Sequence, residues 1–333
     1  MNLHFSKRAG APSRRRELLF PLRMGMKVFH HLQDIAREGP VVLAIGFFDG
    51  FHLGHQAILA RTKEMACAAG AVPGILTFDP HPASVLFPER PVELLQGEAE
   101  KESMMEDLGV SLAVILRPTR EFLAEPAESF LKELGGLSSL RGIVCGGNFT
   151  FGRGARGGAA MLAAYFEDRP VETAVVPLLR SEAIGGRVIS STEIRGLLQE
   201  GDVERAALLL GRRPALSGDV VHGFRRGTEA TGFPTANLSF GKDRVLPRDG
   251  VYAVYAKIRG RRYPAVTNVG ENPTFGNGAR TVETFILDFD DSIYGEPFSI
   301  EFVKYLRGEV RFPSVDALRM QIALDIRKAR SLL

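Results

Sequence analysis

Between residues 41 and 176 the sequence alternates short apolar runs with helical stretches, and this alternation constrains the fold more than any other feature. The apolar runs have the length of buried strands, and we expect strands at Val41–Gly46, Val72–Phe78, Val110–Leu116, Gly142–Cys145 and Val171–Val176. The predicted helices between them are Leu53–Ala69, Glu98–Leu108 and Pro126–Leu134. Strands that alternate with helices form parallel sheets covered on both faces. The predicted fold class is therefore α/β, with a doubly wound parallel sheet.

The pattern changes after residue 211. Two helices, Ser191–Gln199 and Val203–Leu210, lead up to this point. Beyond it, alternating strands such as Gly250–Ile258 and Thr281–Phe289 are separated by Gly, Pro, Asn and Asp turns, which is typical of an antiparallel barrel or sandwich. An amphipathic helix over Ser314–Leu332 ends the chain. The 333 residues are thus predicted to form two domains, 26–211 and 212–333, after an extension over residues 1–25.

Composition excludes several classes of protein. The chain is 45% hydrophobic and 24% charged, and its best apolar run, residues 41–48, is too short for a membrane span of ~18 residues. Residues 1–25 hold six basic groups against Glu17 alone, so the rest of the chain has a formal charge of −2 and is not a basic nucleic-acid binder. The two cysteines, Cys67 and Cys145, indicate a reducing, cytoplasmic location, with a disulfide between them as the less favoured alternative.

The extension lacks the apolar region of a secretory signal. Its Arg-rich, acid-poor composition resembles an organelle transit peptide, but we favour a disordered tail, or an upstream start codon with Met24 or Met26 as the natural beginning.

The segment from Gly46 to His55, GFFDGFHLGH, leaves the first predicted strand and enters the first helix. In a doubly wound sheet this is where the phosphates of a ligand meet a helix N-terminus. Glycines at 46, 50 and 54 permit close approach of the backbone. His52 and His55 project from one side and can donate hydrogen bonds to a phosphoryl oxygen. Two alternatives remain open: a metal cluster with Asp49, or ordinary capping and core histidines.

A second anion site is predicted at the start of the helix Ser191–Gln199. Three hydroxyls, from Ser190, Ser191 and Thr192, lie one turn before Arg195. Ser190 also forms a capping-box pattern with Glu193. The alternative is a plain helix cap with a surface arginine.

The string from Gly152 to Gly157, GRGARG, matches the dinucleotide-binding pattern, with Asp168 or Glu172 as ribose acids. It makes a nicotinamide oxidoreductase the alternative function. The string follows the fourth or fifth strand rather than the first, and two arginines crowd it, so we regard it as weak evidence. The chain has no P-loop pattern.

In the second domain, Thr235 and Asn237 offer two oxygen ligands that point to one face of an extended strand. Hard oxygen ligands suit Mg²⁺, and the alternative is a polar turn. Glu283 lies on an otherwise apolar strand, where a carboxylate is disfavoured unless it has a task; the alternative is a half-exposed strand residue.

These motifs carry a specific resemblance. The string from His52 to His55 resembles the nucleotide-binding motif of the nucleotidylyltransferase superfamily, and with the string TFDPHP at residues 77–82 it is similar to bacterial bifunctional riboflavin kinase/FAD synthetases. The strings GVY at 250–252, NVGENPTF at 268–275 and LRGE at 306–309 match the kinase part of that family. The resemblance covers about residues 26–332. It implies a nucleotidylyltransferase-like domain followed by a kinase β-barrel with a terminal helix.

The activities implied are phosphorylation of riboflavin by ATP to FMN and adenylylation of FMN by a second ATP to FAD, with release of pyrophosphate and Mg²⁺ at both sites. ATP is the co-substrate, and FMN and FAD are the products. A flavin-binding or nucleotide-binding regulator without turnover is the non-enzyme alternative. Neither a nucleic acid nor a membrane is expected as a partner.

The resemblance also implies residue roles. The catalytic residues would be His52, His55, Arg195 and Glu283, with Glu283 accepting the proton of the ribityl 5′-hydroxyl. The nucleotide-binding residues would be Gly46, Phe47, Asp49, Gly54, Asn148, Ser190, Ser191, Thr192, Gly223, Arg226 and Gly227. Flavin would contact Phe78, Pro80, Asn148, Arg307 and Glu309, and Mg²⁺ would bind Thr235 and Asn237. Phe47 departs from the family, which usually carries Asn there, as do Ala230-Thr231 and Glu271-Asn272.

Because residues 1–25 precede all patterned sequence, a chain shortened to begin at Met26 is expected to keep its melting temperature and both implied activities. Thermal unfolding and chromatography of the flavins formed from riboflavin and ATP measure these properties. Loss of soluble protein or of either activity would show that the extension is structural.

Overall fold

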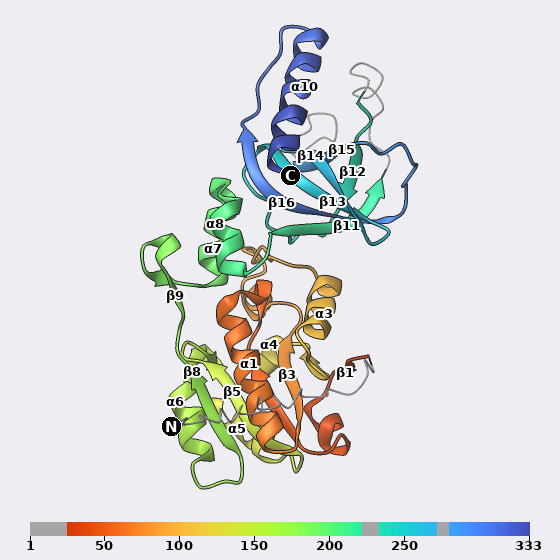
Figure 1. Cartoon of the computed structure of the whole chain (residues 1–333). Coiled ribbons are helices and arrows are strands. Elements are labelled where there is room, and N and C mark those ends of the chain that lie inside the picture. The colour runs from red at the N-terminus through yellow and green to blue at the C-terminus, as the bar shows by residue number, and fades with distance from the viewer. Residues whose placement is uncertain (1–24, 222–232, 272–279) are drawn as a thin grey trace, which may run out of the picture.

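The computed structural model describes residues 25–221, 233–271 and 280–333. Figure 1 shows a domain of parallel strands and helices, a connecting pair of helices, and a barrel that carries a long terminal helix. The predicted extension lies almost wholly outside the described residues.

The first domain is built on a six-stranded sheet. Its strands are β1 (Lys27–Phe29), β2 (Val41–Ile45), β3 (Val72–Phe78), β4 (Leu112–Leu116), β5 (Leu140–Gly146) and β8 (Glu172–Val176). They lie in the order β1-β4-β3-β2-β5-β8, and every neighbouring pair is parallel. The prediction of a doubly wound parallel sheet is confirmed.

Helices cover both faces of this sheet (Figure 1). Alternate residues of β2 enter different cores: Val42 and Ala44 pack with residues of α1 (Leu53–Ala68) and α3 (Glu98–Asp107), whereas Leu43 and Ile45 pack with residues of α5 (Ala127–Gly135) and α6 (Ala159–Phe166). The shorter elements are α2 (Pro82–Leu86), α4 (Arg120–Leu123), the strands β6 (Thr150–Phe151), β7 (Gly157–Gly158), β9 (Arg180–Ser181) and β10 (Arg187–Val188), and the 3-10 helices η1 (Leu32–Arg37), η2 (Asp49–Phe51), η3 (Arg153–Ala155) and η4 (Glu182–Ile184). Double coverage explains why the strands are almost continuously apolar.

Several details differ from the sequence prediction. The strand predicted as Thr281–Phe289 spans Arg280–Ile286, since the chain turns at Asp288, which has a positive φ of 55°. The fourth strand begins at Leu112 rather than Val110, because the Val110 N–H donates to the Met105 carbonyl and so closes α3. The edge strand β1 was not predicted, since three residues carry too little pattern. Cys67 and Cys145 are both free, so the alternative of a disulfide between them was wrong.

Two helices, α7 (Ser191–Glu200) and α8 (Val203–Leu210), connect the domains (Figure 1). Ser190 caps α7, since its Oγ accepts a hydrogen bond from the Glu193 N–H at 3.2 Å. The predicted capping box is present only in this half, because the Glu193 carboxylate accepts a hydrogen bond from Arg187 instead.

The second domain is a closed antiparallel barrel. Its strands are β11 (Ala215–Val221), β12 (Ala236–Ser239), β13 (Gly250–Ile258), β14 (Arg261–Glu271), β15 (Arg280–Ile286) and β16 (Pro297–Arg307), in the order β11-β12-β15-β14-β13-β16. β16 pairs with both β11 and β13, which closes the ring. The terminal helix α10 (Val315–Leu332) packs its Ala329 against Val251 and Leu306 of the barrel. The predicted barrel with a terminal helix is confirmed. Among the described residues, no helix is both long and apolar enough to cross a membrane.

Strand β11 passes very close to β12 at Gly218. A Cβ at this position would lie 1.7 Å from the carbonyl oxygen of Ser239, a backbone atom that cannot move without displacing its strand. We therefore expect Gly218→Ala to lower the free energy of unfolding by ~1–3 kcal/mol or more, which is the usual cost of overpacking. Calorimetry would show a lower melting temperature.

The matched control is Gly196→Ala in α7, where a Cβ would have nothing within 4 Å. Helix propensity predicts an equal or higher melting temperature for this variant. A Gly218→Ala chain that melts with the parent would contradict the close approach.

Candidate active sites

The first predicted motif forms a tight turn from β2 into α1. Phe48, Gly50 and Phe51 have positive φ angles of 59°, 79° and 39°. A left-handed conformation costs ~1–2 kcal/mol for a residue with a Cβ, so surrounding contacts must hold Phe48 and Phe51 in place. The turn delivers His52 to the N-cap position of α1.

His52 and His55 lie against each other as predicted. Their rings stack with centroids 3.7 Å apart. The Nδ1 atom of His52 accepts a hydrogen bond from the His55 backbone N–H at 3.3 Å. Because an acceptor nitrogen carries no proton, the neutral His52 ring has its proton on Nε2. His52 therefore has an N–H directed away from the helix cap for a ligand.

Both imidazoles are neutral at pH 7. Burial, followed by the charge of Arg212, lowers the pKa of His52 to about 4. Burial also lowers the pKa of His55 well below its ordinary value. Any hydrogen bond that these rings donate to a ligand would therefore come from a neutral imidazole rather than from a cation.

The second predicted motif meets the first through a buried ion pair. Arg195 of α7 donates to Asp49 Oδ2 at 3.1 Å, and the Ser191 hydroxyl donates to the Asp49 carbonyl at 2.9 Å. The other carboxylate oxygen, Oδ1, accepts from the Leu95 N–H at 2.9 Å. Two motifs 146 residues apart in the sequence are thereby brought together.

Asp49 is only 4% exposed, and burial raises the pKa of its carboxyl while Arg195 and the Leu95 N–H lower it. Both carboxylate oxygens are engaged within the protein, so the side chain orients Arg195. Among the residues that the structure describes, no group of three His, Cys, Asp or Glu side chains could hold a metal ion. The alternative of a metal cluster with His52 and His55 therefore has no support.

Arg195 keeps donors for a ligand. Its Nε is buried and has no hydrogen-bond partner among the described residues, and its Nη1 reaches the Thr192 hydroxyl only at 3.4 Å. Ser190 and Ser191 already cap α7 and hold Asp49, respectively. The guanidinium therefore keeps more free donors for an anion than the serine hydroxyls of this motif do.

Sequence reasoning missed Lys101 of α3. Its Nζ donates to the Phe78 carbonyl at 3.2 Å and lies 4.2 Å from the centroid of the Phe47 ring. Burial lowers the pKa of Lys101 to about 8. The Phe47 ring also meets the edge of the His81 ring, with centroids 4.2 Å apart. The spacing of Lys101 with Met104, Met105 and Leu108 was the signal that this lysine faces inward.

The remaining predicted residues of this domain lie at the carboxyl edge of the sheet. Gly46 and Phe47 follow β2, Phe78 is the last residue of β3 and Pro80 lies two residues beyond it, and Asn148 follows β5. Pro80 and Asn148 are exposed. A Cβ at Gly54 would lie 3.1 Å from the His52 ring, so this glycine leaves room for the imidazole.

The glycine loop at 152–157 has a packing role. A Cβ on Gly152 would lie 2.5 Å from the Ala127 backbone, and the Arg153 N–H donates to the Glu125 carbonyl. The loop joins β6 to its antiparallel partner β7 before α6 begins. A dinucleotide-binding loop runs directly from a parallel strand into a helix, so this geometry does not support an oxidoreductase.

The barrel holds a second candidate site, a cavity of about 630 Å³ between its mouth and α10. Glu283 of β15 lies in it, directly opposite Asn237 of β12 and Asn268 of β14 in the strand register. Residues opposite one another in a sheet share a face. Thr235, two residues before Asn237, also lines the cavity.

Arg307 and Glu309 lie at the rim beside α10. Arg307 makes bidentate hydrogen bonds to the buried carboxylate of Asp325, at 2.8 to 3.1 Å. Glu309 accepts from the Asn268 amide at 3.5 Å and lies so close to Gly270 that a side chain there would collide with it. The predicted nucleotide residues Gly223, Arg226 and Gly227 lie outside the described residues.

Comparison with known proteins finds a separate family match in each half of the chain. A family model described as FAD synthetase matches residues 34–193, and one described as riboflavin kinase matches residues 210–333. A bifunctional riboflavin kinase/FMN adenylyltransferase from Listeria monocytogenes is 35% identical over 292 residues, which cover 87% of this chain and 91% of the relative. A protein of the same name from Bacillus subtilis is 33% identical over 304 residues, covering 90% and 94%.

A crystal structure described as a macrolide-efflux protein from Streptococcus pneumoniae aligns with a TM-score of 0.82 and 31% identity, over 92% of this chain and 98% of that one. Its description belongs to that protein alone. Because the curated relatives match along both domains, the chain belongs to the family of bifunctional riboflavin kinase/FMN adenylyltransferases.

Proposed function

We propose that residues 26–211 transfer the adenylyl group of ATP to FMN, and that residues 212–333 phosphorylate riboflavin. The observation that supports the first assignment is the meeting of His52, His55 and Arg195 at the carboxyl edge of the sheet. The observation that supports the second is the placement of Glu283 in the cavity of the barrel, opposite Asn237 and Asn268 in the strand register.

In adenylyl transfer, a phosphate oxygen of FMN attacks the α-phosphorus of ATP, and the bond from that phosphorus to the pyrophosphate oxygen breaks. No protein nucleophile is needed, so catalysis rests on positioning and on stabilisation of charge. Arg195 supplies a positive charge for the departing pyrophosphate. His52 donates from Nε2 to a phosphoryl oxygen without carrying a charge of its own.

The flavin and adenine are proposed to lie along Phe47, Phe78, Pro80 and Asn148 at the same edge. The family usually carries a polar Asn at position 47, whereas Phe47 supplies an aromatic ring. The contact of this ring with His81 holds it in place. Lys101, close beneath it, adds a second buried cation to the site.

In the barrel, Glu283 accepts the proton of the ribityl 5′-hydroxyl as that oxygen attacks the γ-phosphorus of ATP, and ADP leaves. The cavity volume lies within the range of sites for small cofactors. Val251, Val266 and Phe285 provide apolar walls for the flavin ring. Arg307 and Glu309 lie at the rim, where they can contact its polar edge.

The oxygen atoms of Thr235 and Asn237 fit a magnesium ion, because they are hard, neutral donors on one face of the chain next to Glu283. When bound, the ion would neutralise phosphate charge during transfer. We place the protein in the reducing cytoplasm, which the two free thiols support.

The decisive experiment is incubation with riboflavin, ATP and Mg²⁺, followed by chromatography of the flavins. Successive appearance of FMN and FAD is expected. A regulator without turnover would leave riboflavin unchanged.

Replacement of His52 and His55 by Ala is expected to lower FAD formation from supplied FMN by at least ~10²-fold, the scale for loss of an oxyanion donor. FMN formation should survive, since the kinase residues lie in the barrel. His52→Asn is the sharper variant, because its side-chain oxygen can still cap α1 while the Nε2 donor is lost. It should lose FAD formation at an unchanged melting temperature.

The exposed His31 provides a control, and His31→Ala should leave both activities intact. If FMN and FAD formation fell together in the His52 variants without unfolding, the two-site assignment would be wrong.

Glu283→Gln keeps the shape of the side chain but removes its basicity. Riboflavin phosphorylation should fall by ~10²–10⁴-fold, the usual worth of general-base assistance, while riboflavin still binds. Supplied FMN should still become FAD at a near-normal rate. Both rates can be followed by chromatography, and riboflavin binding by fluorescence.

The control is Glu301→Gln on β16, whose carboxylate pairs with Arg262 and does not line the kinase cavity. A Glu283→Gln enzyme that phosphorylates riboflavin within a few-fold of the parent would remove the catalytic role of Glu283.

A further inference from the structure

The strained turn at residues 48–51 is held by a segment far from it in the sequence, Leu94–Gln96. The Leu95 N–H donates to Asp49 Oδ1, and the Gln96 amide donates to the Phe48 carbonyl at 3.1 Å. The Leu95 side chain packs so tightly on Gly50 that a Cβ there would lie 2.6 Å from it. This segment therefore fixes both the orientation of Asp49 and the left-handed backbone at Phe48.

The barrel holds the segment in turn. The Leu94 N–H donates to the Asp243 carbonyl at 2.6 Å, and the Val245 N–H donates to the Leu94 carbonyl at 3.0 Å, which forms a parallel bridge between the domains. These contacts come from the connection between β12 and β13.

Arg244 makes the most extensive of these contacts. Its guanidinium donates to the Leu95 carbonyl at 3.1 Å, to the Ala215 carbonyl at 3.4 Å and to the Glu100 carboxylate at the start of α3. The side chain is only 4% exposed. Glu100 also accepts from the Gly97 N–H at 2.7 Å, so one ion pair fixes both ends of the segment that enters α3.

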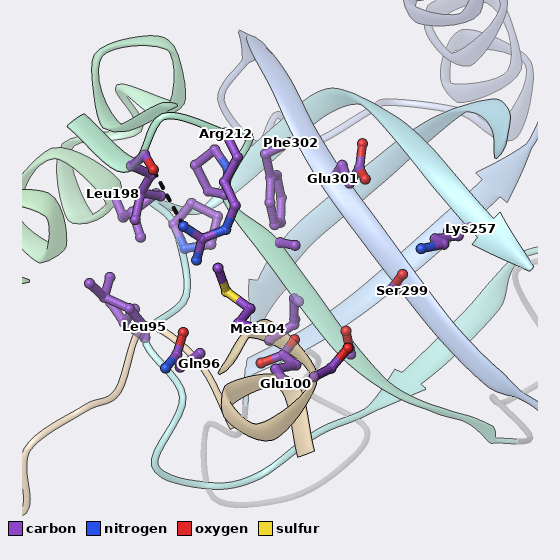
Figure 2. A pocket seen from close by; sticks show the side chains of 18 of the residues that line it. Leu95, Gln96, Glu100, Met104, Leu198, Arg212, Lys257, Ser299, Glu301 and Phe302 are labelled. Atoms are coloured by element: carbon purple, nitrogen blue, oxygen red, sulfur yellow. Dashed lines mark hydrogen bonds between the residues drawn. The ribbon is translucent and has the colours of Figure 1, made fainter. Parts of the chain in front are cut away.

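The linker between the domains supports the turn from another direction. Arg212 donates to the Gly50 carbonyl at 2.8 Å, and the Gln56 amide joins the carbonyls of Phe51 and Leu210. Figure 2 looks into the cleft of about 440 Å³ between the domains, with Leu95, Gln96 and Glu100 along one side and Arg212 above them. The turn thus depends on groups that belong to the barrel or lead into it.

We propose that Arg244 of the barrel is a positioning residue for adenylyl transfer, which holds Leu94–Gln96 and through it Asp49, Arg195 and the strained turn. The inference rests on the proposed function of the first domain. The buried guanidinium of Arg244 is directed to protein acceptors, so its loss should slow the chemical step rather than weaken substrate binding. Misplacement of catalytic groups by ~1 Å can cost ~10²-fold in rate.

The test is Arg244→Met in the full chain, which keeps the length of the side chain and removes its hydrogen bonds. The kcat for FAD formation from supplied FMN should fall ~10- to 10²-fold, with KM for FMN and ATP within about threefold. Riboflavin phosphorylation by the same preparation should stay within about twofold. An unchanged kcat for FAD formation, or an equal fall in both activities, would overturn the proposal.

The matched control is Arg259→Met, which removes an arginine of the same barrel paired with Glu296 and Asp291. Neither activity should change. Should Arg244→Met fail to fold, Arg244→Lys serves instead, because one ammonium cannot reach all three acceptors. It should give an intermediate loss of kcat for FAD formation alone, and full activity would overturn the proposal.

A double-mutant cycle tests the route of the effect. If Arg244 acts through Asp49, adding Arg244→Met to Asp49→Asn should cost far less than it costs the parent. Fully multiplicative losses would refute that route. If His52→Asn leaves FAD formation intact, the proposed active site itself is wrong. If His52→Asn abolishes FAD formation but Arg244→Met leaves it intact, only the positioning role of Arg244 is wrong.

Discussion

The buried ion pair between Asp49 and Arg195 is the interaction on which the proposed active site of the first domain depends. A buried pair is favourable only when further hydrogen bonds satisfy the charges that have left water. Here the Leu95 N–H completes the coordination of Asp49, and the Ser191 hydroxyl fixes its backbone. Because Arg195 lies on α7 and Leu95 lies before α3, one carboxylate joins three parts of the chain that are remote in sequence.

Burial also determines which polar groups of that site carry a charge. It keeps the histidines neutral, since the pKa of His52 falls to about 4, while Arg195 forms an ion pair with Asp49. Positive charge is therefore concentrated on Arg195 and Lys101. The neutral imidazoles can donate directed hydrogen bonds to a phosphate. If both were charged, the site would contain four cations, which would repel one another in the absence of a phosphate ligand.

The sequence predicted those features that local pattern determines. The parallel strands, α1 and α8 were predictable because an apolar run, a cap or a glycine stop lies within each segment, and the His-x-Gly-His motif is contiguous. Arg244 was missed because its contacts are remote in the sequence. The partner of Arg244 at Leu95 is 149 residues away, and no local pattern distinguishes this arginine from those on the surface. The start of the fourth strand was misplaced because Val110 is apolar both as a strand residue and as the residue that closes α3.

The first domain depends on contacts from the second more than the second depends on the first. The barrel closes on itself through β16 and β11, and the described residues that line its cavity come from the barrel, from α10 and from the connection between them. The turn at residues 48–51, in contrast, contains two phenylalanines in left-handed conformation that no local hydrogen-bond pattern favours. Contacts from the linker and from the segment next to Arg244 offset that strain. Thr235, which lines the kinase cavity, lies nine positions before Arg244, so β12 and the connection that follows it link the kinase cavity to the residue proposed to position the first site.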